Sequence, residues 1–189
     1  MNTVYLQHMA WISALGTGEA ARDALFATVP QGVAPTQLHT PGRALHLGCV
    51  AAALPCLDAG PAPFRSRSNA LLAALLPQLQ PAVQDALARF GPARIAVVLG
   101  ISAAGLEEGV AAARRFAAQG QWPPGYDYAQ QEMGNGAAFL ARALGTRGPA
   151  YTVSTACSSG AKALASAARL LRAGIADAVV AGGVDALSG

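Results

Sequence analysis

One stretch near the C-terminal end of the sequence constrains the fold more than any other. It spans 152–163 and passes from β-branched residues through small residues to Cys157, and an alanine- and leucine-rich helical pattern follows over 161–173. A strand, a tight turn, a cysteine and a helix in this order place the thiol beside free backbone N–H groups and the positive end of the helix dipole. Both favour the thiolate, so Cys157 is a candidate nucleophile on a sharp turn. A buried core cysteine is the alternative that the local chemistry leaves open.

The rest of the chain predicts alternating strands and helices. Apolar periodicity and breaker residues predict strands over 3–12, 94–100 and 178–185, a strand or hairpin within 44–53, helices over 17–28, 70–90, 102–119, 128–144 and 161–173, and loops over 30–41, 55–63 and 120–125. Thr17 and Ser102 are the expected caps of two of these helices. Pro77 and Pro81 must kink the helix over 70–90 or divide it.

These patterns predict an α/β fold. The run Ile95–Leu99 is apolar without a break and ends at Gly100, which is typical of a buried strand in a parallel sheet. Repeated strand–helix–strand units then imply right-handed crossovers and a mostly parallel sheet with helices on both faces. The helix over 161–173 is small or apolar nearly all round, which predicts a buried helix. At 189 residues, one domain is expected.

Composition excludes several kinds of function. The net charge is +3 from only 13 basic residues without a basic run, so nucleic acid is not an expected partner. Hydrophobic residues make up 53% of the chain, yet no apolar run is long enough to cross a bilayer. No Lys or Arg precedes Arg22, which argues against a signal peptide, so a cytoplasmic protein without membrane attachment is expected.

No metal or cofactor site is predicted. The three cysteines are odd in number and unevenly spaced, and the three histidines form no ligand spacing with them. Residues 16–21 fit the dinucleotide pattern G-x-G-x-x-A, but three residues separate them from the strand. Gln37, Leu38 and His39 also stand where an acidic ribose ligand belongs. Turn formation explains these glycines better.

The segment 148–160 carries a resemblance to a known family. It reads GPAYTVSTACSSG and resembles the active-site segment of β-ketoacyl-[acyl carrier protein] synthases, the condensing enzymes of the thiolase-like superfamily. The helix over 161–173 and the glycine-containing strand over 178–185 follow at the family's distances, and the resemblance keeps its order over essentially the whole chain. It implies that residues 1–189 form the N-terminal half of a thiolase-like fold, with a buried central helix after Cys157 and the C-terminal half absent.

The resemblance also implies a reaction. Cys157 would accept an acyl group as a thioester, and its backbone N–H would help to hold the oxyanion. A carbanion formed by decarboxylation of malonyl-[acyl carrier protein] would then attack the thioester, in fatty-acid, polyene or polyketide-type synthesis. The implied partners are acyl carrier protein, loaded with acyl or malonyl groups, and a second subunit in a homodimer or heterodimer.

The chain departs from the family pattern at the catalytic bases. The family supplies two histidines, a lysine and a second oxyanion donor from its C-terminal half, and His8, His39, His46 and Lys162 match none of these positions. We therefore expect an N-terminal portion that is inactive in condensation by itself. Apolar surface left by the missing half is expected to favour association.

Two segments bear on the branch of the family and on the acyl pocket. Residues 65–69 and 126–134 resemble bacterial elongating synthases, including those of aryl-polyene-type pathways. The family places the helical region around 131–135 near the dimer interface and the far end of the partner's acyl pocket. This implies a substrate-pocket or interface role for Gln131, Met133 and Asn135, with plain helix capping and packing as the alternative.

Three other functions stay open at this point. One is a non-catalytic partner subunit comparable to chain-length factors, which usually lack the cysteine. Another is a degradative thiolase-type acyltransferase, although the residues that flank Cys157 look like the synthase pattern. The last is a domain that binds or supports structure without chemistry.

Overall fold

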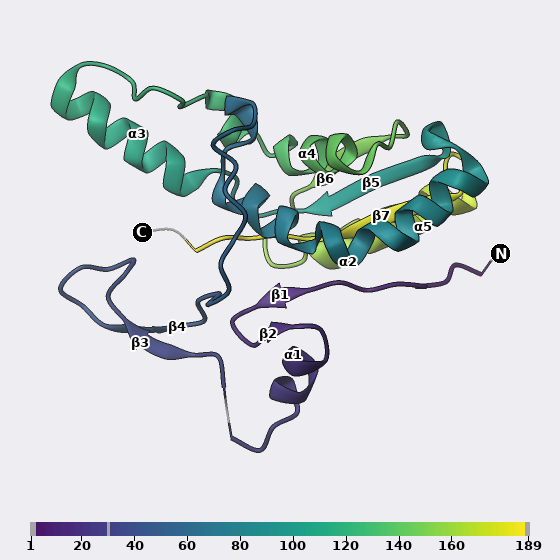
Figure 1. Ribbon diagram of the computed structural model, residues 1–189, viewed down its shortest axis with the longest axis horizontal. Helices are drawn as coiled ribbons and strands as arrows, with labels where there is room; N and C mark the ends of the chain where they lie inside the picture. Colours follow the sequence, from purple (N-terminus) through teal and green to yellow (C-terminus); the bar gives the residue numbers. More distant parts are fainter. Residues whose placement is uncertain (1–2, 30, 188–189) are drawn as a thin grey trace.

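A three-stranded parallel sheet lies at the centre of the computed structural model, which describes residues 3–29 and 31–187 (Figure 1). Its strands are β5 (Ile95–Gly100), β6 (Ala150–Val153) and β7 (Ala178–Gly183), in the order β6-β5-β7. Both neighbours run parallel to β5, and Val97 pairs with Ala150 on one side and Val180 on the other. Every residue of β5 is buried. The central buried strand expected from the apolar run is thus confirmed.

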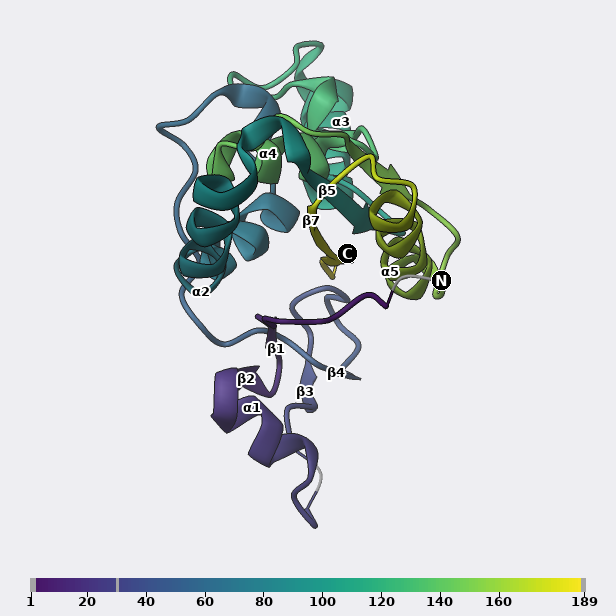
Figure 2. The same ribbon diagram turned by 90° about the vertical axis from the view of Figure 1, so that its right-hand side faces the viewer.

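Helices cover both faces of this sheet (Figure 2). On one face α4 (Asn135–Leu144) packs on β5 and β6, with α2 (Arg67–Phe90) against it, and on the other α5 (Ser159–Arg172) packs across all three strands. The chain crosses from β5 to β6 on one side of it, and then from β6 past β5 to β7 on the other side. Two crossovers of the same hand must then place their helices on opposite faces. The predicted α/β fold class is confirmed.

The hydrophobic core lies between α2, α4 and the sheet. Its buried members are Leu71, Leu72, Val83, Val97, Leu99, Ile101, Ala137, Leu140, Leu144 and Val184. Helix α2 begins after Ser66, whose side chain accepts a hydrogen bond from the Asn69 N–H. It continues through Pro77 and Pro81 as one helix and is not divided, although each proline leaves a carbonyl one turn earlier without its usual donor.

Two predicted helices begin later than expected. Helix α3 (Leu106–Gln119) starts after Gly105 and not at Ser102, whose side chain donates to the Ala156 carbonyl and does not cap a helix. Gly105 has a φ of 52°, and a Cβ there would lie 2.1 Å from the Gln130 carbonyl oxygen, so a glycine is required. The helix predicted over 128–144 consists of the short 3₁₀ helix η3 (Tyr128–Gln131) and α4, since the chain between them is not helical.

The N-terminal third differs most from prediction. The strand expected over 3–12 is wrong except at its end, where β1 (Ile12–Ser13) pairs with β2 (Gly16–Thr17). A β-rich sequence forms a strand only where a neighbour completes its hydrogen bonds. Instead this segment lies against α2, where His8 Nε2 is 2.7 Å from the Gln78 carbonyl oxygen.

The elements that follow are short. Helix α1 (Gly18–Leu25) ends before the predicted Thr28, and Thr17 stands at its N-cap without a side-chain bond. The predicted loop over 30–41 contains β3 (Ala34–Thr36), which forms a hairpin with β4 (Leu45–Leu47), whereas Pro30 lies outside the described residues. The prediction that 44–53 holds a short strand or part of a hairpin is therefore confirmed, whereas the loop predicted over 30–41 is wrong at 34–36, where β3 forms. Two further 3₁₀ helices, η1 (Ala62–Phe64) and η2 (Pro92–Arg94), lead into α2 and β5.

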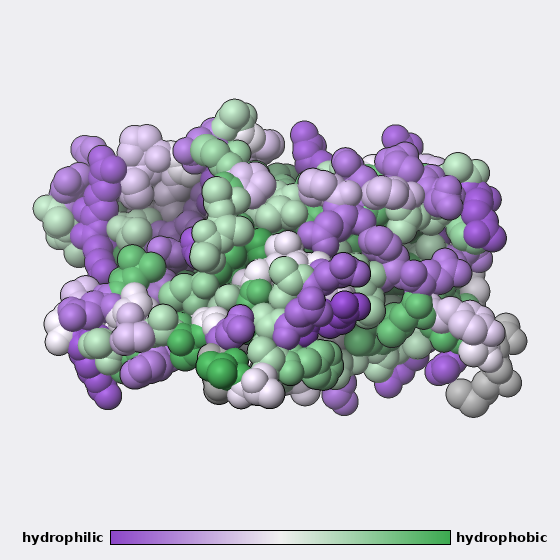
Figure 3. Space-filling model, turned by 60° about the horizontal axis from the view of Figure 1, so that its bottom comes forward, coloured by the Kyte–Doolittle hydropathy of each residue, from purple (hydrophilic) through white to green (hydrophobic). Residues whose placement is uncertain are grey.

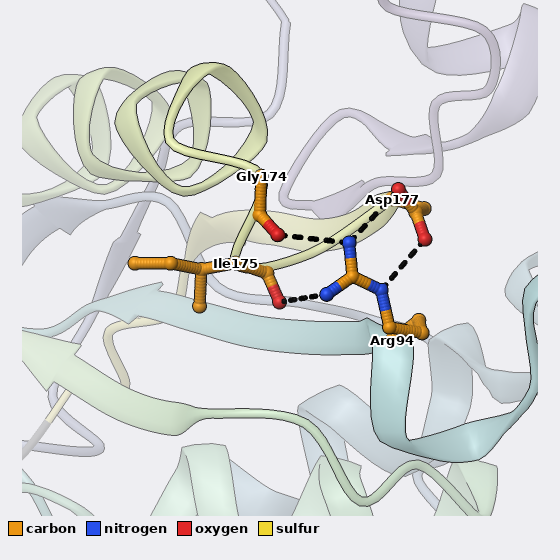
Figure 4. Close-up of polar contacts among 4 residues, drawn as sticks. All are labelled: Arg94, Gly174, Ile175 and Asp177. Carbon is orange, nitrogen blue, oxygen red and sulfur yellow. Dashed lines mark hydrogen bonds and ion pairs between the residues drawn. The ribbon is translucent and has the colours of Figure 1, made fainter.

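A charged cluster ties the amino ends of β5 and β7 together (Figure 4). The Arg94 guanidinium donates to both carboxylate oxygens of Asp177, at 2.7 and 3.1 Å, and to the carbonyls of Gly174 and Ile175. The hydrogen bond from Arg94 lowers the pKa of Asp177 below its ordinary value of 3.8, and the same bond raises the pKa of Arg94. Because these residues come directly before the two strands, they hold the strand starts in register.

Within the described residues, helix α5 is buried on the side that faces the sheet, and burial on every side stays a prediction for a fold that includes a C-terminal half. Ser159, Ala163 and Ala167 are buried, whereas Leu164 is 43% exposed. The small residues on the outer side of the helix cover nothing within the described chain. Small and apolar residues on the outer side of α5 are suited to packing against further structure, which the described residues do not supply.

Apolar side chains also lie on the surface of the N-terminal elements. Figure 3 shows this side, where hydrophobic residues lie in patches between hydrophilic ones. Tyr5, Leu6, Met9, Phe26 and Val29 are all largely exposed, Phe26 by 79%. Among the described residues, no helix is both long enough and apolar enough to cross a membrane.

Candidate active site

Cys157 lies at the carboxyl end of the sheet. It follows β6 after a short turn and directly precedes Ser158, the N-cap of α5. Its side chain is exposed, so it is not the buried core cysteine of the alternative interpretation. The thiol is placed just before the first turn of α5, which begins two residues earlier than the helical pattern over 161–173 predicted. This edge is where parallel α/β sheets bind their ligands.

The turn before the cysteine has an unusual backbone. Ala156 has a φ of 52°, and it is the only non-glycine residue with a positive φ among those described. The left-handed conformation costs an L-residue about 1–2 kcal/mol, so other contacts must hold it. It reverses the chain between β6 and α5 within a few residues and places Cys157 at the apex.

Serine side chains hold this turn. Ser159 Oγ donates to the Ala156 carbonyl at 2.6 Å and accepts from the Thr155 N–H at 2.9 Å, and the Ser159 N–H also donates to the Ala156 carbonyl. Ser158 Oγ donates to the Thr155 carbonyl at 2.8 Å. The serines that follow the cysteine thus satisfy the carbonyls that precede it, which offsets the backbone strain.

Close contact between α5 and β5 depends on Gly100. A Cβ at this position would lie 2.3 Å from the Ser159 carbonyl carbon and 2.5 Å from the Gly160 nitrogen. Only a glycine at the end of β5 lets the first turn of α5 pack on the strand. This contact fixes where the helix begins, and hence where the thiol lies.

Backbone donors are available beside the thiol. Within the part of the chain that the structure describes, the N–H groups of Gly160 and Ala161, in the first turn of α5, donate to no backbone carbonyl outside the helix. They lie at the positive end of the α5 dipole. The arrangement can therefore stabilise negative charge that develops on sulfur or on an oxygen bound next to it.

Two polar residues at the same edge were missed by the sequence analysis as site residues. Ser102 follows β5 and Asp185 follows β7, and both take part in hydrogen bonds around the turn: Ser102 Oγ donates to the Ala156 carbonyl, and Asp185 Oδ1 accepts from the Ser102 N–H. Their positions in the sequence could have identified them, because residues that follow the carboxyl ends of neighbouring parallel strands meet at one edge of the sheet.

The predicted pocket or interface residues lie elsewhere, around the connection between η3 and α4. Asn135 is only 7% exposed; its Nδ2 donates to the carbonyls of Pro63 and Ala129 and its Oδ1 accepts from Asn69 Nδ2. Gln131 Nε2 donates to the Tyr126 hydroxyl, and Met133 packs against the core. The structure does not bring these three residues to the Cys157 turn, and their pocket or interface role stays a prediction.

The other cysteines and the histidines are not part of the Cys157 turn. Cys49 is partly buried and Cys56 exposed, both in the segment between β4 and η1. His39 and His46 belong to the separate β3–β4 hairpin region, and His8 contacts α2. Among the described residues, no group of His, Cys, Asp and Glu side chains is arranged to hold a metal ion.

Comparisons with known proteins agree with this geometry. The family profile described as β-ketoacyl synthase, N-terminal domain, matches residues 70–189, which include all three strands of the parallel sheet and Cys157. A solved structure described as the ketosynthase ApeO in complex with its chain length factor ApeC, from Xenorhabdus doucetiae, is similar at 38% identity and a TM-score of 0.83. A search of curated proteins found no match.

A second solved structure shows the same fold. It is a β-ketoacyl synthase from Burkholderia phymatum STM815, with 21% identity and a TM-score of 0.71. Each of these two comparisons covers 96% of this chain, but only 48% and 46% of the matched chains. The chain thus spans about half the length of the proteins it resembles.

Proposed function

Because the chain belongs to the β-ketoacyl synthase family, we propose that it carries the nucleophile of a condensing enzyme, and that Cys157 is this nucleophile. The supporting observation is the placement of its exposed thiol at the start of α5, beside N–H groups of the first turn that, among the described residues, donate to no backbone carbonyl outside the helix. A thiolate there attacks a thioester carbonyl more readily than the thiol does.

The proposed reaction has two stages. First, Cys157 Sγ bonds to the acyl carbon of a thioester, the carrier's C–S bond breaks, and the carrier leaves as a thiol with the proton. In the second stage a malonyl thioester loses CO₂, and the carbanion attacks the acyl carbon. A C–C bond forms, and the Cys157 thiolate is released. The Cys157 N–H stabilises the oxyanion in both stages.

In this proposal, these 189 residues supply only part of the catalytic groups. No histidine belongs to the Cys157 turn, and the matched proteins are about twice as long. We propose that residues 1–189 form an N-terminal domain, and that the histidines and the lysine that act on the malonyl group come from a C-terminal half. The exposed outer side of α5 is the surface that such a half would cover.

A related subunit and an acyl carrier protein are the proposed partners. The similar solved structure holds a ketosynthase together with its chain length factor, which supports a heterodimer of related chains, with a homodimer as the alternative. Fatty-acid, polyene and polyketide-type synthesis all need this reaction, and the aryl-polyene branch is the proposed one. A cytoplasmic location stays a prediction.

The test is acylation of the chain by an acyl-[acyl carrier protein], followed by mass spectrometry of its peptides. We expect the acyl group on Cys157 and no acylation of the Cys157→Ala variant. Cys56→Ala is the matched control, because Cys56 is also an exposed free thiol, and this variant should be acylated like the wild type. An acyl group on Cys49 or Cys56 in preference to Cys157 would exclude the proposal.

The same experiment separates the two stages. With malonyl-[acyl carrier protein] added, the 189-residue chain should release no CO₂ and form no β-ketoacyl product, because the groups that act on the malonyl thioester are not among these residues. Sustained turnover by the purified chain would show that the division into halves is wrong. A non-catalytic partner subunit, the main alternative, would show neither acylation nor turnover.

A further inference from the structure

We propose that Ser102 and Asp185 are positioning residues that aim the Cys157 backbone N–H at the oxyanion of the acyl-transfer step. The inference rests on the proposed function, in which Cys157 is the nucleophile. Neither residue contacts the reacting atoms in this proposal. Both act through the peptide bond that joins Ala156 to Cys157.

Asp185 fixes the chain that follows β5. Its Oδ1 accepts hydrogen bonds from the backbone N–H groups of Ser102 at 2.7 Å and Ala103 at 3.3 Å. Asp185 is held beside them because the Val184 N–H donates to the Gly100 carbonyl, one step beyond the last strand pair. Hydrogen bonds from N–H groups to a carboxylate are stronger than those between neutral groups. The residues after β5 therefore have a defined position relative to β7.

Ser102 connects the chain after β5 to the turn that precedes Cys157. Its Oγ donates to the Ala156 carbonyl oxygen at 3.2 Å, and the Ile101 N–H donates to the Val153 carbonyl at 3.3 Å. The Ala156 carbonyl also accepts from Ser159 Oγ, which belongs to α5. Hydroxyl groups from two separate elements thus hold one carbonyl oxygen.

Holding this carbonyl sets the direction of a catalytic donor. The Ala156 C=O and the Cys157 N–H belong to one peptide unit, which is planar and trans, so the N–H points opposite to the carbonyl. The two serine hydroxyls lie on the carbonyl side, so the N–H is directed away from them. Hydrogen bonds to the carbonyl also polarise the peptide unit and make its N–H a stronger donor.

Because Ala156 is held in the left-handed conformation, the direction of this peptide is not its relaxed one. Without the Ser102 hydroxyl, the described residues hold the carbonyl from α5 alone, through the Ser159 hydroxyl and N–H, and the peptide gains freedom to rotate. The thiol itself stays exposed. Only a reaction that uses the N–H should then suffer.

Two reactions of the same thiol test this. Acyl transfer from a short acyl thioester builds an oxyanion at the acyl carbon, whereas alkylation by iodoacetamide displaces iodide and builds none. We expect Ser102→Ala and Asp185→Ala to slow acylation of Cys157 about tenfold, below the loss seen when an oxyanion donor is removed outright. Alkylation should stay within about twofold of the wild-type rate, because thiol exposure and the α5 dipole are unchanged.

Conservative variants and a control complete the design. Ser102→Thr keeps the hydroxyl and should restore acylation, and Asp185→Asn keeps an acceptor oxygen and should lose less than Asp185→Ala. Ser154→Ala changes an exposed serine next to the turn and should match the wild type in both reactions. If circular dichroism shows that an alanine variant does not fold, the conservative variants still test the positioning role. Ser102→Thr should then be acylated at the wild-type rate and Asp185→Asn more slowly.

The results of these experiments distinguish failure of the positioning role from failure of the proposed function. If the wild-type chain is not acylated at Cys157, the proposed function fails. If the wild type is acylated and the alanine variants are equally fast, only the positioning role is wrong. Acylation and alkylation slowed together by the same factor would also overturn it, because that is the result expected of a general structural role.

Discussion

At the scale of single residues, the position of the thiol depends on the conformation of its neighbour. Ala156 has a positive φ, and hydroxyl groups of Ser102 and Ser159 hold its carbonyl. A small residue at this position tolerates the strain that places Cys157 at the apex of the turn. The residues that surround the cysteine thus determine the backbone geometry of its turn.

This strain leads to a prediction for Ala156→Val. A β-branched residue is strongly disfavoured at a positive φ, so the variant should lose roughly 2 kcal/mol of unfolding free energy and be acylated more slowly. Urea denaturation and the acylation assay measure the two effects. Ala150→Val is the matched control, because Ala150 is an exposed strand residue where valine is favoured. Equal stability of the two variants would contradict the assigned strain.

The sequence predicted Cys157 as a candidate nucleophile but not the hydrogen bonds around it. Cys157 could be singled out because strand, turn and helix patterns meet there. The left-handed turn at Ala156 could not, because alanine carries no signal for a positive φ. Ser102 was expected to cap α3, yet its side chain donates to the carbonyl of Ala156, 54 residues later. Local patterns do not show contacts made through tertiary structure.

At the scale of elements, strand β5 organises the site. It lies between β6 and β7 and is buried along its whole length, and its last residue, Gly100, touches the first turn of α5. The apolar run made this strand predictable from sequence. The N-terminal strand was wrongly predicted over 3–12, because its β-rich composition carries no information about whether a partner strand exists.

The Gly100 contact predicts the effect of Gly100→Ala. The added methyl group would lie 2.3 Å from backbone atoms that cannot move without displacing α5, so we expect a loss of roughly 3 kcal/mol, at the upper end for overpacking. Gly182→Ala is the control on the neighbouring strand, because a Cβ there meets nothing within 4 Å. Chemical denaturation of both variants distinguishes a steric effect from a general cost of replacing strand glycines; similar losses would refute the steric explanation.

At the scale of the whole molecule, the two ends of the sheet differ in what holds them. The amino ends of β5 and β7 are joined by the Arg94–Asp177 ion pair, and the carboxyl ends by hydrogen bonds around the cysteine turn. The two-sided α/β arrangement followed from the sequence pattern. The exposed outer side of α5 agrees with the apolar surface that the sequence predicted for a chain without a C-terminal half.

The ion pair predicts how stability depends on pH. The pKa of Asp177 is lowered in the folded state by its hydrogen bond from Arg94, so the ionised carboxylate stabilises the fold above the ordinary value of 3.8. This contribution is lost as the pH falls below 3.8 through the lower folded value. Asp177→Asn should therefore melt at a lower temperature than the wild type at neutral pH, with the difference shrinking in acid.

Thermal melting followed across this pH range measures the effect. Asp23→Asn is the control, because Asp23 pairs with its own neighbour Arg22 and joins no separate elements. It should change the melting temperature little at any pH. A melting difference for Asp177→Asn that does not vary with pH would mean that lost packing, and not the ion pair, is responsible.

The separation of these two ends has a consequence for replacing the thiol. Cys157 is exposed, and the side-chain hydrogen bonds that hold its turn come from Ser102, Ser158 and Ser159, while the Arg94–Asp177 pair joins the strands at the opposite end of the sheet. An inert residue at position 157 should therefore leave the scaffold intact, unlike replacements of Gly100 or Ala156.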